Sequence, residues 1–461
     1  MRSEATNWSK ATNWSEATNR FEPAFPWITS RFAGALIVIA FVLACSAFVP
    51  ALLWVSFAAG AALLGLLLAD IALGPRRGEI ELEREPVSHL ALRAPATLDY
   101  SIANRSRVAV RYGIVDTPVD RLQFPEDAVV GVVGPGRRKI ERLSVTPLER
   151  GAAQLGLIYL WVENPIGLVR RRWRIADSEE ARIYPDLSAV ERYGMLARRN
   201  RLAEAGFRRL RLRGGGGEFD SLREWTPDDE FRSIDWKATA RRNKLMVAQH
   251  DIERSQTVMM VLDAGRLMTP RIGGQQKFDY AVTAALSVAA IASLADDKVG
   301  LMAFAGGILE HVPPRSGERH SAGLVQRIYD LQPRFEESDY AGAFAYLRQR
   351  QGKRSLIVFF TDMFDPVASA TVLSNVAILS PRHLVICVLM NDEAIEQAMA
   401  VDPKTPADAY RASVAANLQA ERRKAAAILG QRGVAVLDVP AAQLTVSLIN
   451  AYVDVKSRNL L

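Results

Sequence analysis

The chain has 461 residues, of which 49% are hydrophobic and 24% are charged, so it is long enough for two or three domains and has the composition of a globular protein with some membrane sequence. Its net charge of +7 favours contact with anionic surfaces, either lipid headgroups or nucleic acid. The two cysteines, Cys45 and Cys387, lie in apolar runs, and the five histidines are scattered. These patterns argue against a disulfide and a zinc site, and they fit a reducing compartment.

The first 31 residues are predicted to form a disordered tail. Residues 3–20 consist of consecutive copies of a polar hexapeptide. The first copy begins at Ser3 and the last ends at Arg20. The period is far too short for the unit of a solenoid protein, so no fold is predicted for this segment.

Residues 32–69 form an apolar run without a charged side chain. As a helix at about 1.5 Å per residue, the run would extend about 57 Å, which is close to two crossings of a hydrocarbon core about 30 Å thick. Val49 and Pro50 lie near its middle, where a turn is needed. We therefore predict two transmembrane helices within residues 32–73. The run is too long for the apolar region of a cleaved signal peptide.

Arginines flank the apolar run on both sides and the turn is uncharged, so the positive-inside rule places both ends in the cytoplasm. The flanking arginines are Arg20, Arg31, Arg76 and Arg77. The sequence thus predicts a multi-pass protein of the inner (cytoplasmic) membrane whose soluble domains face the cytoplasm.

Residues 78–186 show the alternation of apolar and polar residues that is typical of half-buried strands, for example at Ile80–Glu83 and Thr97–Ile102. Turn clusters such as Gly134–Gly136 separate the strands. Many short strands with closely spaced turns predict a β-sandwich domain. The basic run Arg170–Arg174 is better explained as a solvated strand face than as a nucleic-acid patch.

Residues 187–256 join the predicted sandwich to the next domain. Seven arginines between Arg198 and Arg213 form a basic connector that could contact an anionic membrane surface or an acidic partner. The glycines of Gly214–Gly217 lack the Lys-Ser/Thr that follows in a phosphate-binding loop. No recognised nucleic-acid-binding fold is found, so nucleic acid is not a predicted partner.

A dense motif of apolar and charged residues occupies residues 218–241. Its apolar residues are expected to be buried, together with the charged residues of both signs that lie between them. These charges must be paired, because an unpaired buried charge is very costly. We predict an ion-paired structural clasp that packs onto a domain, and not an active site. The residues assigned to this clasp are Glu218, Phe219, Arg223, Trp225, Asp229, Arg232, Asp235, Trp236 and Arg241.

Residues 257–461 alternate between apolar runs that predict buried strands and segments that predict helices. One helix, Phe278–Leu294, is too apolar on all sides to lie on a surface. This pattern predicts a parallel sheet covered by helices on both faces. The predicted strands are Thr257–Leu262, Val299–Phe304, Ser355–Phe360, Leu384–Met390 and Val434–Leu437.

Together with the glycines that precede it from Gly214 on, the motif at residues 218–241 reads G-x-G-x-E-F-x-x-L-R-E-W-x-P-x-D-x-x-R-x-I-D-W-x-x-x-A-R. This pattern resembles the signature of the membrane-protein family known as domain of unknown function 58. Asp228 stands where the family usually has glycine. The resemblance implies a membrane helical hairpin, then a β-sandwich, then an α/β domain of the von Willebrand factor type A kind, with a Rossmann-type parallel sheet. It also implies a MoxR-type AAA+ ATPase as partner.

In type A domains, a divalent ion is held at the strand ends by an Asp-x-Ser-x-Ser motif, a separate threonine and an aspartate after another strand. Asp263 and Asp362 match the two aspartates, and Ser338 could take the role of the threonine. Gly265 and Leu267 replace the two serines. Because hard cations need several oxygen ligands, these replacements weaken the site.

Two interpretations of these residues stay open. Asp263, Ser338 and Asp362 could bind Mg²⁺ or Mn²⁺, or the site could be degenerate, with Arg266 supplying the positive charge that a metal would have brought. The second interpretation implies no cofactor.

No arrangement of nucleophile, base and acid is found in the sequence, so an enzyme is not predicted. The resemblance implies a membrane-anchored scaffold or adaptor that works with the ATPase through its type A-like domain. The alternative is a metal-dependent receptor that binds a ligand at Asp263 and Asp362.

Overall fold

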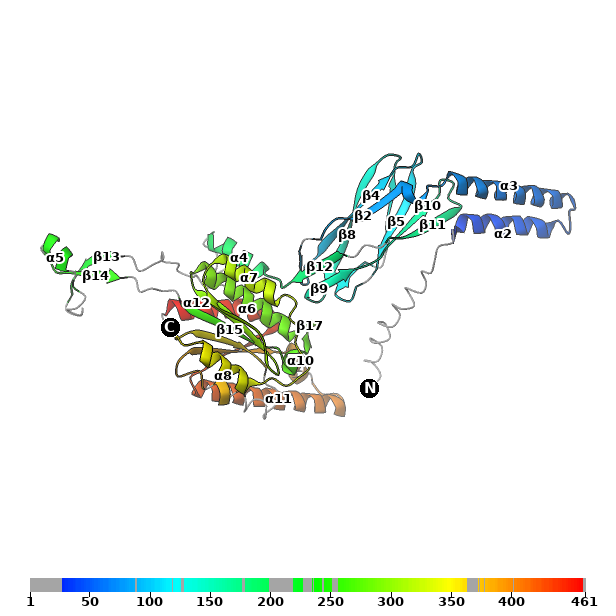
Figure 1. Cartoon of the computed structure of the whole chain (residues 1–461). Helices are drawn as coiled ribbons and strands as arrows, with labels where there is room; N and C mark the ends of the chain where they lie inside the picture. The colour runs from blue at the N-terminus through cyan, green and yellow to red at the C-terminus, as the bar shows by residue number, and fades with distance from the viewer. Residues whose placement is uncertain are drawn as a thin grey trace. The chain divides into compact units, whose positions relative to one another are not determined.

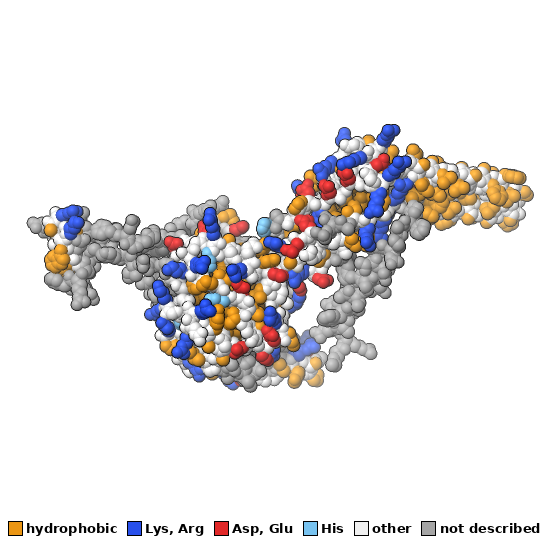
Figure 2. Space-filling view, in the orientation of Figure 1, with side chains coloured by type: hydrophobic (Ala, Val, Ile, Leu, Met, Phe, Trp, Pro, Cys, Tyr) orange, Lys and Arg blue, Asp and Glu red, His pale blue; other side chains and the backbone are white. Residues whose placement is uncertain are grey.

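The apolar run folds as two helices joined by a short turn, which lie side by side (Figure 1). In this computed structural model, α2 comprises Ser30–Cys45 and α3 comprises Ala51–Leu73. Figure 2 shows that their outward side chains are mostly apolar. By length and composition α3 can cross a membrane, whereas α2 is shorter, with 16 residues. The prediction of two apolar helices is confirmed, and they point to membrane association.

The structure describes residues 27–198, 219–226, 234, 236–242, 244–250 and 256–458, except for residues 88, 118, 126–127, 176–178, 363–371, 373, 377 and 401. The chain divides into two units, Met1–Ile183 and Tyr184–Leu461.

The first unit is a β-sandwich with the helical hairpin attached to it. Its strands are β1 (Trp27–Ile28), β2 (Ile80–Arg84), β3 (Leu90–Ala91), β4 (Ala96–Asn104), β5 (Val110–Asp116), β6 (Leu122–Gln123), β7 (Val129–Val133), β8 (Arg138–Pro147), β9 (Gly151–Leu155), β10 (Ile158–Glu163), β11 (Val169–Ile175) and β12 (Glu179–Tyr184). They form sheets in the orders β1-β11-β10-β5-β7, β2-β4-β8-β6 and β3-β12-β9. The apolar residues of the predicted alternating pattern, such as Leu98 and Ile102, meet in one core.

A buried ion pair crosses this core. Arg84 Nη2 lies 2.8 Å from Asp116 Oδ2, and neither side chain is exposed to solvent. The Tyr100 hydroxyl donates to the same carboxylate. Burial raises the pKa of Asp116, and burial together with the neighbouring Asp116 carboxylate raises the pKa of Tyr100, so the phenol keeps its proton as a donor.

The base of the hairpin is fixed to the sandwich by one carboxylate. Asp70, in the last turns of α3, is completely buried. Its Oδ1 accepts the backbone N–H of Ile166 at 2.8 Å, and its Oδ2 accepts those of Leu168 and Val169 at 2.9 Å each. Asn164 Nδ2 donates to the carbonyl oxygen of Asp70 at 2.9 Å. The turn between β10 and β11 therefore supplies the hydrogen bonds that this buried charge needs.

The second unit contains a six-stranded sheet in the order β19-β18-β15-β20-β21-β22. Only β18 and β19 are antiparallel; the other neighbours run parallel. The strands are β15 (Thr257–Asp263), β18 (Lys298–Phe304), β19 (Ile308–Arg315), β20 (Leu356–Phe360), β21 (Leu384–Asn391) and β22 (Ala435–Pro440). All five predicted strands are present, and β19 is an additional edge strand.

Helices cover both faces of this sheet (Figure 1). Buried residues of α6, α7 and α12 pack on the face that carries Val258 and Met260, and those of α8 and α11 pack on the face that carries Met259 and Val261. The helices are α6 (Lys277–Leu294), α7 (Glu318–Ile328), α8 (Tyr340–Arg350), α10 (Glu393–Ala400), α11 (Pro406–Gln431) and α12 (Leu444–Ser457). The apolar α6 is thus a core helix, as its sequence predicts.

The described part of the motif at residues 218–241 forms a strand and a short helix. β13 (Phe219–Glu224) pairs with β14 (Met246–His250), and α5 comprises Trp236–Arg242. A further helix of this unit, α4 (Ser188–Arg198), precedes them.

Candidate functional site

The two aspartates predicted from the sequence lie at the carboxyl ends of neighbouring strands. Asp263 is the last residue of β15, and Asp362 follows β20 by two residues. The chain leaves β15 for β18 on one side and later returns to β20 on the other side, so the strand order reverses here. Open α/β sheets bind ligands at such a point.

Asp263 is fully buried and is surrounded by hydroxyl donors. Its Oδ1 accepts from Ser338 Oγ at 2.5 Å and from the backbone N–H of Gly265 at 2.9 Å. Its Oδ2 accepts from the Tyr340 hydroxyl and from Thr361 Oγ1, both at 2.7 Å. Burial and the adjacent carboxylate raise the pKa of Tyr340, so its phenol stays a donor. Ser338, which the sequence analysis placed in the threonine's role of a metal site, thus contacts Asp263 directly, and its role as a metal ligand stays a prediction.

Asp362 is equally buried, but its partners are cations. Lys277 Nζ lies 2.5 Å from its Oδ2, and Arg422 Nη1 lies 3.0 Å from its Oδ1. Both cationic side chains are only 2% exposed. Arg422 also contacts Asp438 Oδ1 through Nη2 at 2.8 Å. Lys277 begins α6 and Arg422 lies within α11, so helices from opposite faces of the sheet meet on one carboxylate.

In the interpretation of a degenerate site, Arg266 supplies the positive charge that a metal would have brought. The structure pairs Arg266 with a different carboxylate. Gly265 precedes a 3₁₀ turn, η4 (Arg266–Met268), and the Arg266 Nε atom pairs with the Glu337 carboxylate at 2.5 Å. Both side chains are substantially exposed, with 40% for Arg266 and 71% for Glu337. The charge beside Asp362 comes from Lys277 and Arg422, which the sequence analysis missed.

The oxygens that a divalent cation would need already have other partners. Each oxygen of Asp362 faces a cation, and each oxygen of Asp263 already accepts two hydrogen bonds. Gly265 and Leu267 offer no side-chain oxygen, whereas hard cations take six or more oxygen ligands. Within the described part of the chain, no group of three or more His, Cys, Asp or Glu side chains could hold a metal ion.

The predicted clasp residues are only partly described. Glu218, Asp229, Arg232 and Asp235 lie outside the described residues. Phe219 and Arg223 lie in β13, Trp225 follows that strand and is half-buried, and Arg241 in α5 is exposed.

Trp236, which the sequence analysis expects to be buried, is 61% exposed at the start of α5. The neighbouring Ile234 and Ala238 are buried instead, so the apolar face of this helix does not include the indole. The ion pairing of the clasp stays a prediction.

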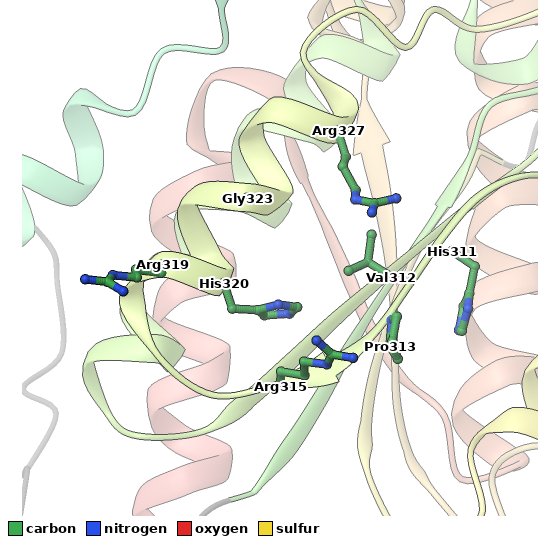
Figure 3. A pocket seen from close by; sticks show the side chains of 8 residues that line it. All are labelled: His311, Val312, Pro313, Arg315, Arg319, His320, Gly323 and Arg327. Carbon is green, nitrogen blue, oxygen red and sulfur yellow. The ribbon is translucent and has the colours of Figure 1, made fainter.

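A pocket of about 250 Å³ lies between the edge strand β19 and α7. Its lining includes Arg315, Arg319 and Arg327 and contains no acidic residue. In Figure 3, Arg315 and Arg327 lie near Val312 at its floor, and Arg319 points away. Arg327 is partly neutralised from outside the pocket by Glu310, at 2.8 Å.

Two histidines flank the floor of this pocket. His320 Nε2 donates to the carbonyl oxygen of Val299 at 2.8 Å, which assigns the proton to Nε2 because a carbonyl can only accept. Burial and the neighbouring Arg350 lower the pKa of His311, so this ring is neutral at pH 7.

Comparison with known proteins agrees with the resemblance of the motif. Residues 221–426 match the family model described as protein of unknown function DUF58. Uncharacterized proteins of Mycobacterium tuberculosis and Mycobacterium bovis are 26% identical over 219 residues, which are 44% of this chain and 69% of each relative.

Among solved structures, a PapD-like domain of human CEP192 matches 23% of this chain and 87% of its own, with 8% identity and a TM-score of 0.18. The cupredoxin domain of amoB from Nitrosocaldus yellowstonii matches 24% of this chain and 89% of its own, with 10% identity and a TM-score of 0.17. Scores this low carry no argument about function.

Proposed function

We propose that the chain is a membrane-anchored adaptor, in which a von Willebrand factor type A-like domain binds a protein partner and the helical hairpin holds the assembly at the inner membrane. The observation that carries the proposal is the internal charge balance at the strand ends. Asp362 is held by two buried cations and Asp263 by four hydrogen-bond donors, so neither carboxylate is available as a base, nucleophile or metal ligand. We therefore propose that this domain acts through its surface.

The order of the strands supports the type A-like assignment. The first strand of the sheet, β15, lies in its interior, and the antiparallel β19 closes one edge. This arrangement agrees with the fold implied by the motif, although a fold alone does not define a function.

The partner proposed from the resemblance is a MoxR-type AAA+ ATPase, and it would contact the domain on the cytoplasmic side. The pocket between β19 and α7 is the candidate contact, because its arginines can donate hydrogen bonds to acidic side chains of a partner. Opposite charges across an interface chiefly set specificity and the rate of association.

Binding of the purified, full-length chain to a MoxR-type ATPase from the same organism tests the proposal. We expect a complex on size-exclusion chromatography in at least one nucleotide state, which Arg315→Glu weakens. Arg348→Glu, on the exposed side of α8, is the matched control because it makes the same charge change away from the pocket. Absence of a complex in every nucleotide state, or a reporter that places the C-terminal unit outside the cytoplasm, would refute the ATPase assignment.

A metal-dependent receptor is the second candidate, and one observation favours it. Two hydroxyl side chains, Ser338 and Thr361, lie on the Asp263 carboxylate, and hydroxyl and carboxylate oxygens are suitable ligands for Mg²⁺. Because a metal would have to displace Lys277 from Asp362, we expect titration calorimetry of the full chain with Mg²⁺, Mn²⁺ and Ca²⁺ to show no micromolar binding. Micromolar binding that Asp263→Ala abolishes would establish the receptor and remove the adaptor proposal's main support.

A further inference from the structure

A second pocket lies within the first unit, where α2 begins. Its volume is about 430 Å³. It is formed by the residues that enter α2 and by one end of strands β5, β10 and β11. The residues that line it are Ile28, Thr29, Ser30, Arg31, Arg111, Glu163 and Arg170.

Two of the three arginines in this pocket, Arg31 and Arg170, lie near one carboxylate, that of Glu163. Glu163 on β10 is directly opposite Arg111 on β5 and Arg170 on β11, so the three side chains lie on the same face of the sheet. Arg170 Nη2 lies 3.4 Å from Glu163 Oε2, and Arg31 Nη1 lies 4.0 Å from Oε1. The Glu163 side chain is only 9% exposed, whereas those of Arg31 and Arg170 are 65% and 44% exposed. The pocket therefore presents an excess of positive charge to solvent.

The first turn of α2 adds to this positive potential. Thr29 is the residue before the helix, but its hydroxyl donates to the carbonyl oxygen of Gly167 at 2.7 Å and does not cap the helix. The first N–H groups of a helix have no intrahelical acceptor, and they carry the positive end of the helix dipole. Ser30 and Arg31 belong to this turn and line the pocket.

Two further contacts hold the geometry of the pocket. The Arg170 guanidinium stacks over the Trp161 ring, 4.2 Å from its centroid, which fixes the arginine against the sheet. Gly167 has a φ of +80°, and a Cβ there would come within 2.7 Å of Arg31 Nη1. A side chain at position 167 would therefore push Arg31 out of its place.

The position of the pocket relative to the apolar helices decides what fills it. From Ala51 to Asp70 the helix α3 rises about 28 Å, nearly the thickness of a hydrocarbon core. Asp70 is hydrogen-bonded to the same turn, residues 166–169, that contacts Thr29. In a bilayer spanned by the hairpin, the pocket thus lies at the depth of the lipid phosphates. Figure 2 shows Lys and Arg side chains on the sandwich beside the apolar hairpin.

We propose that this pocket binds the headgroup of an anionic phospholipid, with Arg31, Arg111 and Arg170 around the phosphate and the first turn of α2 donating backbone hydrogen bonds. Basic pockets beside membrane helices on the cytoplasmic side suit anionic headgroups, and helix N-termini suit phosphate. This inference rests on the membrane anchoring in the proposed function. The bound lipid fixes the hairpin and sandwich at a defined depth.

Native mass spectrometry of the full chain, released from nanodiscs of equal parts phosphatidylglycerol and phosphatidylcholine, tests this assignment. We expect the wild-type chain to retain phosphatidylglycerol preferentially. The double variant Arg111→Gln/Arg170→Gln should lower that preference roughly tenfold to thirtyfold, since each arginine near an anionic surface contributes a factor of about five. Glu163→Gln should raise the preference, because it removes the competing carboxylate.

The matched control is Arg107→Gln/Arg137→Gln, which removes the same charge from exposed positions elsewhere on the sandwich. Equal loss of phosphatidylglycerol in the control, no preference in the wild-type chain, or an unchanged preference in the Arg111/Arg170 variant would overturn the assignment. Displacement of the lipid by millimolar inorganic phosphate would make a soluble phosphate the occupant and would also overturn it.

Membrane fractionation separates this failure from failure of the proposed function. If the wild-type chain is washed from membranes by alkaline carbonate, the anchoring itself is wrong. If all variants stay in the membrane and none selects phosphatidylglycerol, only the lipid site is wrong. Circular dichroism of each variant shows that the sandwich is folded.

Discussion

Asp70 and Asp362 are both fully buried carboxylates, and the two units of the chain stabilise them by different means. Asp70 accepts hydrogen bonds from three backbone N–H groups of one turn. Asp362 contacts two cationic side chains from helices on opposite faces of a sheet. The hydrogen bonds to Asp70 depend on the backbone conformation of a single turn. The ion pairs of Asp362 depend on the identity of two residues that are distant in the sequence. Hence the two sites should respond differently to substitution.

The largest effect is expected at Asp362. Asp362→Asn leaves Lys277 and the inner face of Arg422 without their common counter-charge, and breaking a buried pair costs about 3–5 kcal/mol. Thermal or urea denaturation of the full chain, followed by circular dichroism, measures the loss. Asp438→Asn is the control, because its side chain is 28% exposed and Arg422 keeps Asp362 as a partner. Equal losses in the two variants would show that the charge balance at Asp362 does not stabilise the fold.

A smaller loss is expected for Asp70→Asn. The amide nitrogen cannot accept a hydrogen bond, so at least one backbone N–H of the turn at residues 166–169 loses its acceptor, at a cost of about 1–3 kcal/mol. Protease sensitivity of this turn in the detergent-solubilised chain should rise, while the second unit keeps its melting behaviour. Asp120→Asn, at an exposed position of the same unit, should change neither. Unaltered protection in Asp70→Asn would show that the hairpin is attached by its apolar contacts alone.

The smallest effect is expected from acidification, and it concerns the second unit. Burial and the adjacent Arg382 lower the pKa of His383, and the pKa of His311 is lowered as well. A lowered pKa means that the unfolded chain binds more protons, so the stability contributed by these groups is complete above about pH 6.5 and falls as the pH decreases below it. The melting temperature of the second unit should therefore decrease between pH 7.5 and 5.5, and less so in His383→Gln. An identical decrease in that variant would assign the pH dependence to other groups.

The sequence predicted most of the fold because its signals are local. The alternation in residues 80–102 and the continuous apolar runs of β15, β18, β20 and β21 each reflect the burial of one segment. The apolar character of α6 likewise predicted that it is a core helix. Strand β19 was missed because its polar residues and Pro313 hide the alternation of an edge strand.

The candidate site was predicted only in part, since its contacts join distant segments. Asp263, Ser338 and Asp362 could be found from strand ends and from the resemblance. Arg422 could not, because it lies in a helix rich in arginine and alanine that looks like a solvated surface. Lys277 carried a weak signal, as the only lysine of a largely apolar helix and its first residue.

Asp70 also carries a signal in the sequence. An acidic residue inside a 23-residue apolar helix has a specific partner as a rule. Its partners, however, are backbone groups of residues 166–169, which no side-chain pattern reveals.

The sequence separation of the Asp70 contacts has a consequence for biosynthesis. The N–H groups that satisfy Asp70 belong to residues 96 to 99 positions later in the chain. At about 5–20 residues per second, they leave the ribosome roughly 5–20 s after Asp70 does. If the hairpin enters the membrane as it is made, the carboxylate must stay hydrated at the bilayer surface during that interval. In that case, the hairpin can take its final depth only after translation has passed the β10–β11 turn.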